Sequence, residues 1–151
     1  MYVYEATIIK DEKGYFAQFE DIEAAYAPGD TLEMVIEAAA DTLQLLLAEY
    51  LDTGIQLPQP VFRLSNAETF RVAIAVEVSK EFIERTKCVT VTEAASELGV
   101  SKSRISHMLD SGILQALPFG NERLVTLASI NARKAAPRNA GRPRKEYATA
   151  G

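Results

Sequence analysis

Alternating apolar and polar positions at the start of the chain predict a run of β-strands. Every second residue is apolar in residues 2–8 and again in residues 15–19, and the charged turn KDEKG at residues 10–14 separates the two runs. Strict alternation places one row of side chains on a buried face and the other row in solvent. Residues 22–27 are suited to a third strand, which ends at the turn-forming pair Pro28-Gly29.

The apolar period then changes from two residues to between three and four, which predicts a long helix. Asp30 is positioned to cap this helix together with Glu33, in a capping-box arrangement, and Gly54 is suited to end it. Alternation returns at residues 70–78 and predicts a fourth strand. The apolar stripe of the helix consists of Leu32, Val35, Ile36, Ala39, Leu43, Leu46, Leu47 and Tyr50.

Residues 1–78 are therefore expected to form an α+β domain of order β-β-β-α-β, a small antiparallel sheet with one long helix packed across it. A unit of this size is close to the lower limit for independent stability, so we expect a homodimer or a higher homo-oligomer. Residues 79–88 are expected to link this domain to a second one and to include a short helix capped by Ser79.

Residues 89–136 predict a second, α-rich domain that begins with two short helices joined by a tight turn. Thr92 is positioned to cap the first helix, and Gly99 supplies the left-handed backbone that ends it. Ser101 then caps the second helix, and small Ala95 lets the two helices approach closely. The inward sides are formed by Ala94, Ala95 and Leu98 on the first helix and by Ile105, Met108 and Leu109 on the second.

The rest of this domain predicts the wing of a winged helix-turn-helix. The corner Phe119-Gly120-Asn121 lies between two apolar pieces and favours a β-hairpin. Residues 126–136 are suited to a third helix. From residue 137 the composition changes to Pro, Arg, Gly, Ala and Lys, so residues 137–151 are expected to be a disordered basic tail.

The exposed side of the second short helix carries donors suited to DNA. The candidate contacts to bases and phosphates are Ser101, Lys102, Ser103, Arg104, Ser106 and His107, with Arg123 of the wing. An ordinary helical hairpin with a solvated face is the alternative. In the tail, GRPRK at residues 141–145 resembles the core of an AT-hook, which would place Arg142 and Arg144 in a minor groove. A generic basic tail that strengthens DNA binding without choosing a sequence is the alternative there.

Charge is distributed unevenly along the chain. Residues 1–78 hold 14 Asp and Glu against 4 Lys and Arg, whereas residues 79–151 hold 7 against 12. An acidic half joined to a basic half indicates two partners of opposite charge. Duplex DNA is the expected partner of the basic half.

Other features limit the class of protein. No secretory signal is visible, and residues 34–51 contain three carboxylates, so a membrane partner is not expected. Cys88 is the only cysteine and His107 the only histidine, so no metal site or cofactor is predicted from them. Cytoplasmic residence is the default expectation.

The N-terminal half resembles the HicB antitoxins. The matching pieces are Y-x-A-x-I-x-x-D from Tyr4, GYFAQFED at residues 14–21, PGDTLEMVIEAAADTL at residues 28–43 and LPQP at residues 57–60. The resemblance implies a truncated ribonuclease-H-like fold that binds and masks a HicA-like toxin, a small basic ribonuclease, and a C-terminal module that represses the operon. The C-terminal half is similar to the winged helix-turn-helix of MerR and excisionase-type regulators in TEAASELGVSKSRI, in SGIL and in the wing.

The resemblance gives the acidic half a role. A surface that binds a basic toxin should be acidic, and the candidate toxin-binding residues are Glu20, Asp21, Glu23, Asp30, Glu33 and Glu37. A solubilising acidic surface is the alternative for each of them. A nuclease would require convergence of carboxylates such as Asp11, Asp21 and Asp41 on metal ions, and no enzymatic activity is expected. A ligand-sensing transcriptional regulator without a toxin partner is the other alternative.

Overall fold

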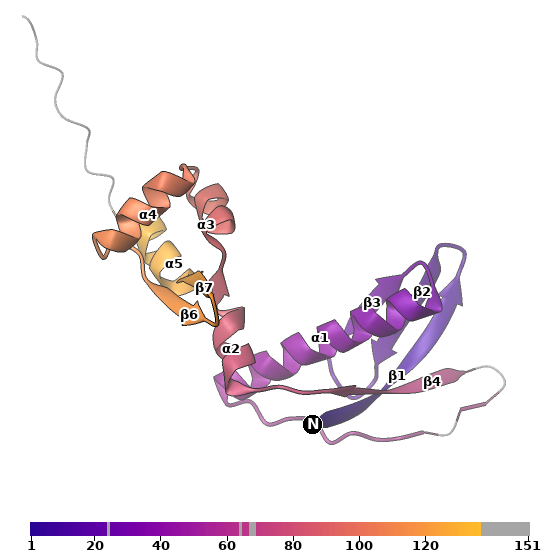
Figure 1. Cartoon of the computed structure of the whole chain (residues 1–151). Helices are drawn as coiled ribbons and strands as arrows, with labels where there is room; N and C mark the ends of the chain where they lie inside the picture. The colour runs from indigo at the N-terminus through magenta and orange to yellow at the C-terminus, as the bar shows by residue number, and fades with distance from the viewer. Residues whose placement is uncertain (24, 64, 67–68, 137–151) are drawn as a thin grey trace, which may run out of the picture. The chain divides into compact units, whose positions relative to one another are not determined.

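The chain divides into two compact units at the bond between Thr86 and Lys87 (Figure 1). The computed structural model describes residues 1–23, 25–63, 65–66 and 69–136. Unit 1 runs from Met1 to Thr86, and the described part of unit 2 runs from Lys87 to Ala136. Each unit has its own cluster of buried apolar side chains, so each is described by itself.

Unit 1 contains a four-stranded antiparallel sheet. Its strands are β1 (Tyr2–Asp11), β2 (Gly14–Phe19), β3 (Tyr26–Gly29) and β4 (Phe70–Val76), in the spatial order β3-β2-β1-β4. The longest strand, β1, lies in the middle of the sheet because β2 pairs along one of its edges and β4 along the other. With the helix between β3 and β4, the predicted order β-β-β-α-β is confirmed. The predicted bounds of the third strand are wrong: β3 begins at Tyr26, not at residue 22, and it includes Pro28 and Gly29, which pair with β2.

Helix α1 (Leu32–Thr53) lies across one face of this sheet (Figure 1). Its predicted stripe supplies the buried residues Val35, Ala39, Leu43 and Leu47, which pack on the inward rows of the strands, while Leu32 is exposed. Gly54 ends the helix in left-handed backbone, as predicted. The predicted cap is wrong by one residue: Thr31, not Asp30, is the N-cap, and its hydroxyl accepts a hydrogen bond from the Met34 amide.

Gly29 allows the end of β3 to approach the first turn of α1 closely. A Cβ at this position would lie 2.7 Å from the Val35 Cα and 2.9 Å from the Met34 carbonyl carbon, both of which are backbone atoms. Backbone cannot rotate away as a flexible side chain can, so the helix would have to move off the sheet. The glycine of the PGD segment is therefore required by packing.

We expect Gly29→Ala to lower the free energy of unfolding of unit 1 by about 3 kcal/mol, at the upper end of the usual overpacking cost. The matched control is Gly54→Ala, where φ is 72° and no atom lies near the added Cβ, so only backbone strain of about 1 kcal/mol is expected. Urea unfolding monitored by tyrosine fluorescence measures both, because five of the six tyrosines of the chain lie in unit 1. Equal losses in the two variants would contradict the packing role of Gly29.

A short helix, α2 (Lys80–Thr86), completes unit 1. The Ser79 hydroxyl accepts a hydrogen bond from the Phe82 amide, as expected of a cap. Phe82 and Ile83 are half-buried, and the helix lies against α1. The segment expected to be a linker, residues 79–88, therefore includes the boundary between the units, and its last residue lies in the sheet of unit 2.

Unit 2 combines three helices with a small antiparallel sheet. The elements are β5 (Cys88–Val89), α3 (Val91–Leu98), α4 (Lys102–Asp110), β6 (Ala116–Phe119), β7 (Glu122–Thr126) and α5 (Leu127–Ala135), with strand order β5-β7-β6. The predicted hairpin corner and the third helix are confirmed. The buried core consists of Ala94, Ala95, Ile105, Met108, Leu114, Val125 and Ile130.

The cap of α3 corrects the sequence prediction. Thr90, not Thr92, is the N-cap: its hydroxyl accepts from the Glu93 amide, and the Glu93 carboxylate accepts from the Thr90 amide at 2.7 Å. The hydrogen bonds that the Glu93 carboxylate accepts from the Thr90 amide and from the Thr90 hydroxyl hold its pKa below the ordinary value. Thr92 is an exposed residue within the helix, whereas Gly99 and Ser101 cap where predicted.

Candidate functional site

The sheet face opposite α1 carries a cluster of five charged side chains. They are Glu5, Glu20, Asp21, Arg63 and Arg71. Glu5 lies on this face because its neighbours in β1, Tyr4 and Ala6, point into the core. Only 7% of the Glu5 side chain is exposed, so its charge requires compensation within the protein.

Two arginines from distant parts of the chain compensate these carboxylates. The Glu5 Oε1 atom lies 3.4 Å from Arg71 Nε and 3.8 Å from Arg63 Nη1, and its Oε2 accepts from the Arg63 amide at 2.8 Å. Arg63 Nε also lies 3.2 Å from Glu20 Oε2, and Arg63 Nη2 lies 2.7 Å from Asp21 Oδ1. Because Arg63 belongs to the connection between α1 and β4, these ion pairs hold that connection against the sheet.

Asp21 is held ionised by this network. Its side chain is 9% exposed, and its oxygens accept hydrogen bonds from the Arg63 guanidinium and from the Val61 amide. The Arg63 hydrogen bond is the main cause that keeps the pKa of Asp21 below its ordinary value, against the effect of burial. Glu20 and Asp21, both predicted as toxin contacts, are thus largely neutralised by cations of the same unit.

The pH dependence of the free energy of unfolding should reveal the contribution of the ion pair between Asp21 and Arg63. Because the folded-state pKa of Asp21 is lowered, its stabilisation is present above the unfolded pKa and is lost as pH falls through the folded pKa. We therefore expect Arg63→Met to be less stable than the unsubstituted chain near neutral pH, with the difference shrinking below about pH 4. Urea titrations from pH 7 to pH 3 measure this. A constant difference would show that Asp21 is not the partner that matters.

The remaining predicted acidic residues are exposed and gather near the start of α1. Glu33 and Glu37 lie one turn apart on the helix, Asp30 lies two residues before it, and all three are exposed. Asp41 continues the same side one turn later, and Glu23 is exposed in the connection before β3. We call Asp30, Glu33, Glu37 and Asp41 the α1 acidic stripe.

Apolar side chains border the α1 acidic stripe. Met34 is 49% exposed and lies one turn before Glu37, and Leu45 is 53% exposed and lies one turn after Asp41. Exposed apolar groups flanked by charges are typical of protein–protein interfaces. This side of α1 therefore has the composition of a surface that binds a basic protein.

In unit 2, the predicted DNA contacts share the solvent side of α4. Ile105 and Met108 are buried against the core, so the opposite side of the helix faces outward. The predicted residues there are all exposed: Ser101, Lys102, Ser103, Arg104, Ser106 and His107. Ser101 is also the N-cap, because its hydroxyl accepts from the Arg104 amide, which leaves a second lone pair on that oxygen.

The wing also presents a cation. Arg123 is exposed on β7 directly beside the turn at Gly120 and Asn121, and it is paired across the hairpin with Pro118. Arg142 and Arg144, predicted as minor-groove contacts, lie outside the described residues.

The described residues show neither a metal-ligand cluster nor a membrane-spanning helix. They contain no group of three or more His, Cys, Asp or Glu residues placed to hold a metal ion. None of the helices in that part of the chain meets the length and hydropathy that a transmembrane span requires.

Comparison with known families decides the class of unit 1. The model of the HicB-like antitoxins of bacterial toxin–antitoxin systems matches residues 2–80, which is more than half of the chain. The chain belongs to the HicB-like antitoxin family. The charged cluster, the α1 acidic stripe and α1 itself all lie within the matched residues, whereas unit 2 lies beyond them.

Curated and solved relatives carry the same HicB description. Antitoxin HicB 1 of Photorhabdus laumondii subsp. laumondii is 32% identical over 102 residues, which cover 66% of this chain and 64% of that protein. The chain therefore spans just under two thirds of the length of this relative. A HicA3 and HicB3 toxin–antitoxin complex is similar at 18% identity with a TM-score of 0.42, covering 50% of this chain and 99% of that one. The antitoxin HicB3 structure is similar at 18% identity with a TM-score of 0.44, covering 52% and 65%.

Sequence reasoning missed Glu5, Arg63 and Arg71. One signal was available: Arg63 and Arg71 are half of the four basic residues in the acidic half of the chain, and they lie close together in the sequence. Their convergence on Glu5 depends on the pairing of β1 with β4, which the alternation pattern does not specify.

Proposed function

We propose that this HicB-like protein binds and masks a HicA-like ribonuclease toxin through unit 1 and represses its own operon by binding operator DNA through unit 2. The observation that supports this most is the separation of exposed charge. The α1 acidic stripe lies in the family-matched unit, and the exposed donors of α4 lie in the other. Neither role requires the antitoxin to carry out chemistry.

The toxin side follows from charge complementarity. A ribonuclease that holds RNA presents cations to phosphates, so an acidic surface on the antitoxin competes with RNA for the same cations. The α1 acidic stripe and Glu23 keep their charges available to a partner, whereas Glu20 and Asp21 are engaged by Arg63. We therefore propose that the toxin-contacting residues are Glu23, Asp30, Glu33 and Glu37 and that Glu20 and Asp21 support the sheet beneath.

The operator side is supported by the element order α3, α4 and the β6–β7 hairpin, which is the order of a winged helix-turn-helix. In such a module the second helix enters the major groove and the wing reaches the flanking backbone or minor groove. A homodimer would place two copies of α4 on half-sites separated by one or more helical turns, ~34 Å each. If toxin binding changes operator affinity, the level of toxin sets the level of repression.

Binding to the DNA upstream of the protein's own gene tests the operator role. Fluorescence anisotropy with a labelled duplex of that region should give tighter binding than a scrambled duplex of equal length. Equal binding to the two duplexes would contradict operator recognition, and no binding to either would contradict DNA binding altogether.

Replacing Lys102 with Ala should weaken binding to both duplexes. Lys102 is exposed in the first turn of α4, where a cation meets a backbone phosphate when the helix lies in a groove. Each neutralised phosphate contributes about 0.9 to the slope of log affinity against log salt concentration, so the slope should fall by about that amount. An unchanged slope would remove Lys102 from the interface.

A further inference from the structure

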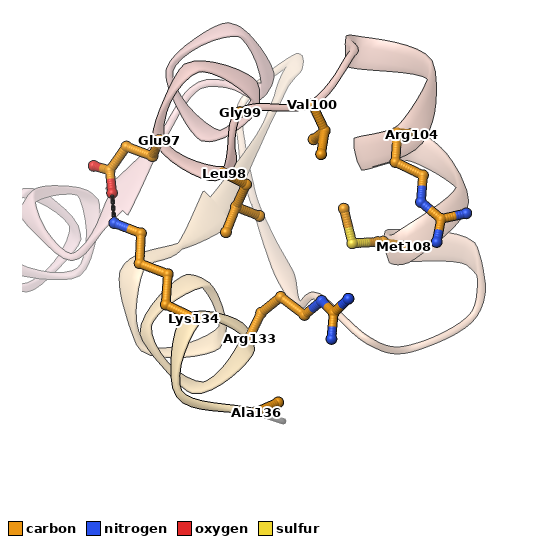
Figure 2. Close-up of a pocket in the computed structure, with 9 residues that line it drawn as sticks. All are labelled: Glu97, Leu98, Gly99, Val100, Arg104, Met108, Arg133, Lys134 and Ala136. Atoms are coloured by element: carbon orange, nitrogen blue, oxygen red, sulfur yellow. Dashed lines mark hydrogen bonds and ion pairs between the residues drawn. The ribbon is translucent and has the colours of Figure 1, made fainter. Parts of the chain in front are cut away.

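A cavity of about 470 Å³ opens beside the helix-turn-helix of unit 2 (Figure 2). The end of α3 and the following turn form one wall, α4 forms the second and the last turn of α5 forms the third. Its apolar lining comes from Leu98, Val100 and Met108, of which Met108 belongs to the buried core. One side of the cavity is therefore formed by the packed core of the unit.

The charges around the cavity do not balance. Arg104, Arg133 and Lys134 contribute three cations, and Glu97 contributes one anion, which leaves a net charge of +2. Lys134 Nζ lies 2.5 Å from a Glu97 carboxylate oxygen, so these two groups neutralise each other and tie α5 to α3.

The two arginines are left for a ligand. Figure 2 shows Arg104 extending from α4 and Arg133 extending from α5, with Met108 between their guanidinium groups. Within residues 87–136, neither guanidinium has a carboxylate partner. Two guanidinium groups beside an apolar lining are suited to bind an oxyanion, because each guanidinium can donate charge-assisted hydrogen bonds to it.

We propose that this cavity binds a phosphate of the DNA backbone between Arg104 and Arg133, which makes the end of α5 part of the nucleic-acid interface. The proposal rests on the proposed binding of α4 to duplex DNA. An α-helix of 10–12 Å diameter fills a major groove about 12 Å wide, so its flanks meet the backbone strands. Arg104 lies on such a flank, about 100° around α4 from exposed Ser103 and next to the buried side that holds Met108.

Duplex DNA is favoured over a free anion by the position of the site. One of the two guanidinium groups belongs to the helix that carries the predicted base contacts, so a backbone phosphate reaches the cavity when that helix is in a groove. A phosphate contact of this kind carries no sequence information and should act equally on any duplex.

The test compares Arg133→Ala and Arg133→Lys in the full chain, by anisotropy with operator and scrambled duplexes over a range of salt concentrations. We expect Arg133→Ala to weaken binding to both duplexes about five- to tenfold and to lower the salt slope by about 0.9. Arg133→Lys should keep the slope. The control Lys13→Ala removes one exposed cation from the β1–β2 turn of unit 1 and should change neither quantity.

The outcomes separate this inference from the proposed function. Unchanged affinity and slope for Arg133→Ala, with the unsubstituted chain still binding duplex, would overturn the inference alone. No duplex binding by the unsubstituted chain would overturn both. Calorimetry with inorganic phosphate at constant ionic strength tests the other source of the anion. Arg133-dependent binding of free phosphate, without any effect of Arg133→Ala on duplex binding, would assign the cavity to a free anion and overturn the duplex assignment.

Discussion

Reversing three charges of the α1 acidic stripe, with Asp30→Lys, Glu33→Lys and Glu37→Lys, should weaken toxin binding at least a hundredfold. Each reversal replaces an attraction to a basic partner by a repulsion, and like charges facing each other across an interface cost several kcal/mol in total. A loss of about 3 kcal/mol corresponds to a factor of about 100 in the dissociation constant. Calorimetric titration with a HicA-like toxin measures the dissociation constant of each variant.

The matched control is a triple variant with the same net charge as the stripe variant. Glu12→Lys, Glu49→Lys and Glu81→Lys also reverse three exposed carboxylates of unit 1, but none of them belongs to the α1 acidic stripe. We expect this control to lower affinity less than tenfold through long-range electrostatics, which salt screens. Similar losses in the two triple variants would show that the overall charge of unit 1, and not the stripe, attracts the toxin.

Replacing Glu5 with Gln should cost unit 1 about 3 kcal/mol of stability. The substitution preserves shape but removes the buried negative charge that lies 3.4 Å from Arg71 Nε and 3.8 Å from Arg63 Nη1. Removing one member of a buried ion pair destabilises a protein because the remaining charge stays desolvated. Urea unfolding followed by tyrosine fluorescence gives the free energy of unfolding.

An exposed carboxylate of the same unit provides the control for Glu5. Glu23→Gln removes the same charge from a solvated position and should change the free energy of unfolding by less than about 0.5 kcal/mol. If Glu5→Gln is as stable as Glu23→Gln, the charged cluster on the sheet does not hold the α1–β4 connection in place. Under conditions in which unit 1 of the Glu5→Gln variant is folded, its affinity for the toxin should equal that of the unsubstituted chain.

Helices and strands could be predicted wherever the spacing of apolar residues along the sequence alone reveals the element. The stripe that includes Val35, Leu43 and Leu47 repeats with the helical period, so α1 followed from spacing alone. The caps were harder because Asp30 and Thr31 are adjacent and both suit an N-cap, and only the backbone angles decide between them. At α3 a signal was present and overlooked: Thr90 and Glu93 have the spacing of a capping box.

The sites were predictable only in part. The exposed row on α4 followed from the helical period, since fixing Ile105 and Met108 inside places Ser103 and His107 outside. The charged cluster was not predictable, because Arg63 and Glu5 are 58 residues apart and meet only once the sheet has formed. Arg133 was missed for the same reason: its role depends on how α5 packs beside α4, which the sequence pattern does not contain.

The most direct test of the two-surface account is the ribonuclease activity of the toxin from the same operon, measured with and without saturating operator duplex. The account predicts that an equimolar amount of this protein abolishes the activity in both conditions, because unit 1 binds the toxin and unit 2 binds the duplex. Undiminished activity at a tenfold excess of the protein would contradict the antitoxin role. Full recovery of activity on adding duplex would show that toxin and DNA compete for one surface, which would contradict the separation of the two functions.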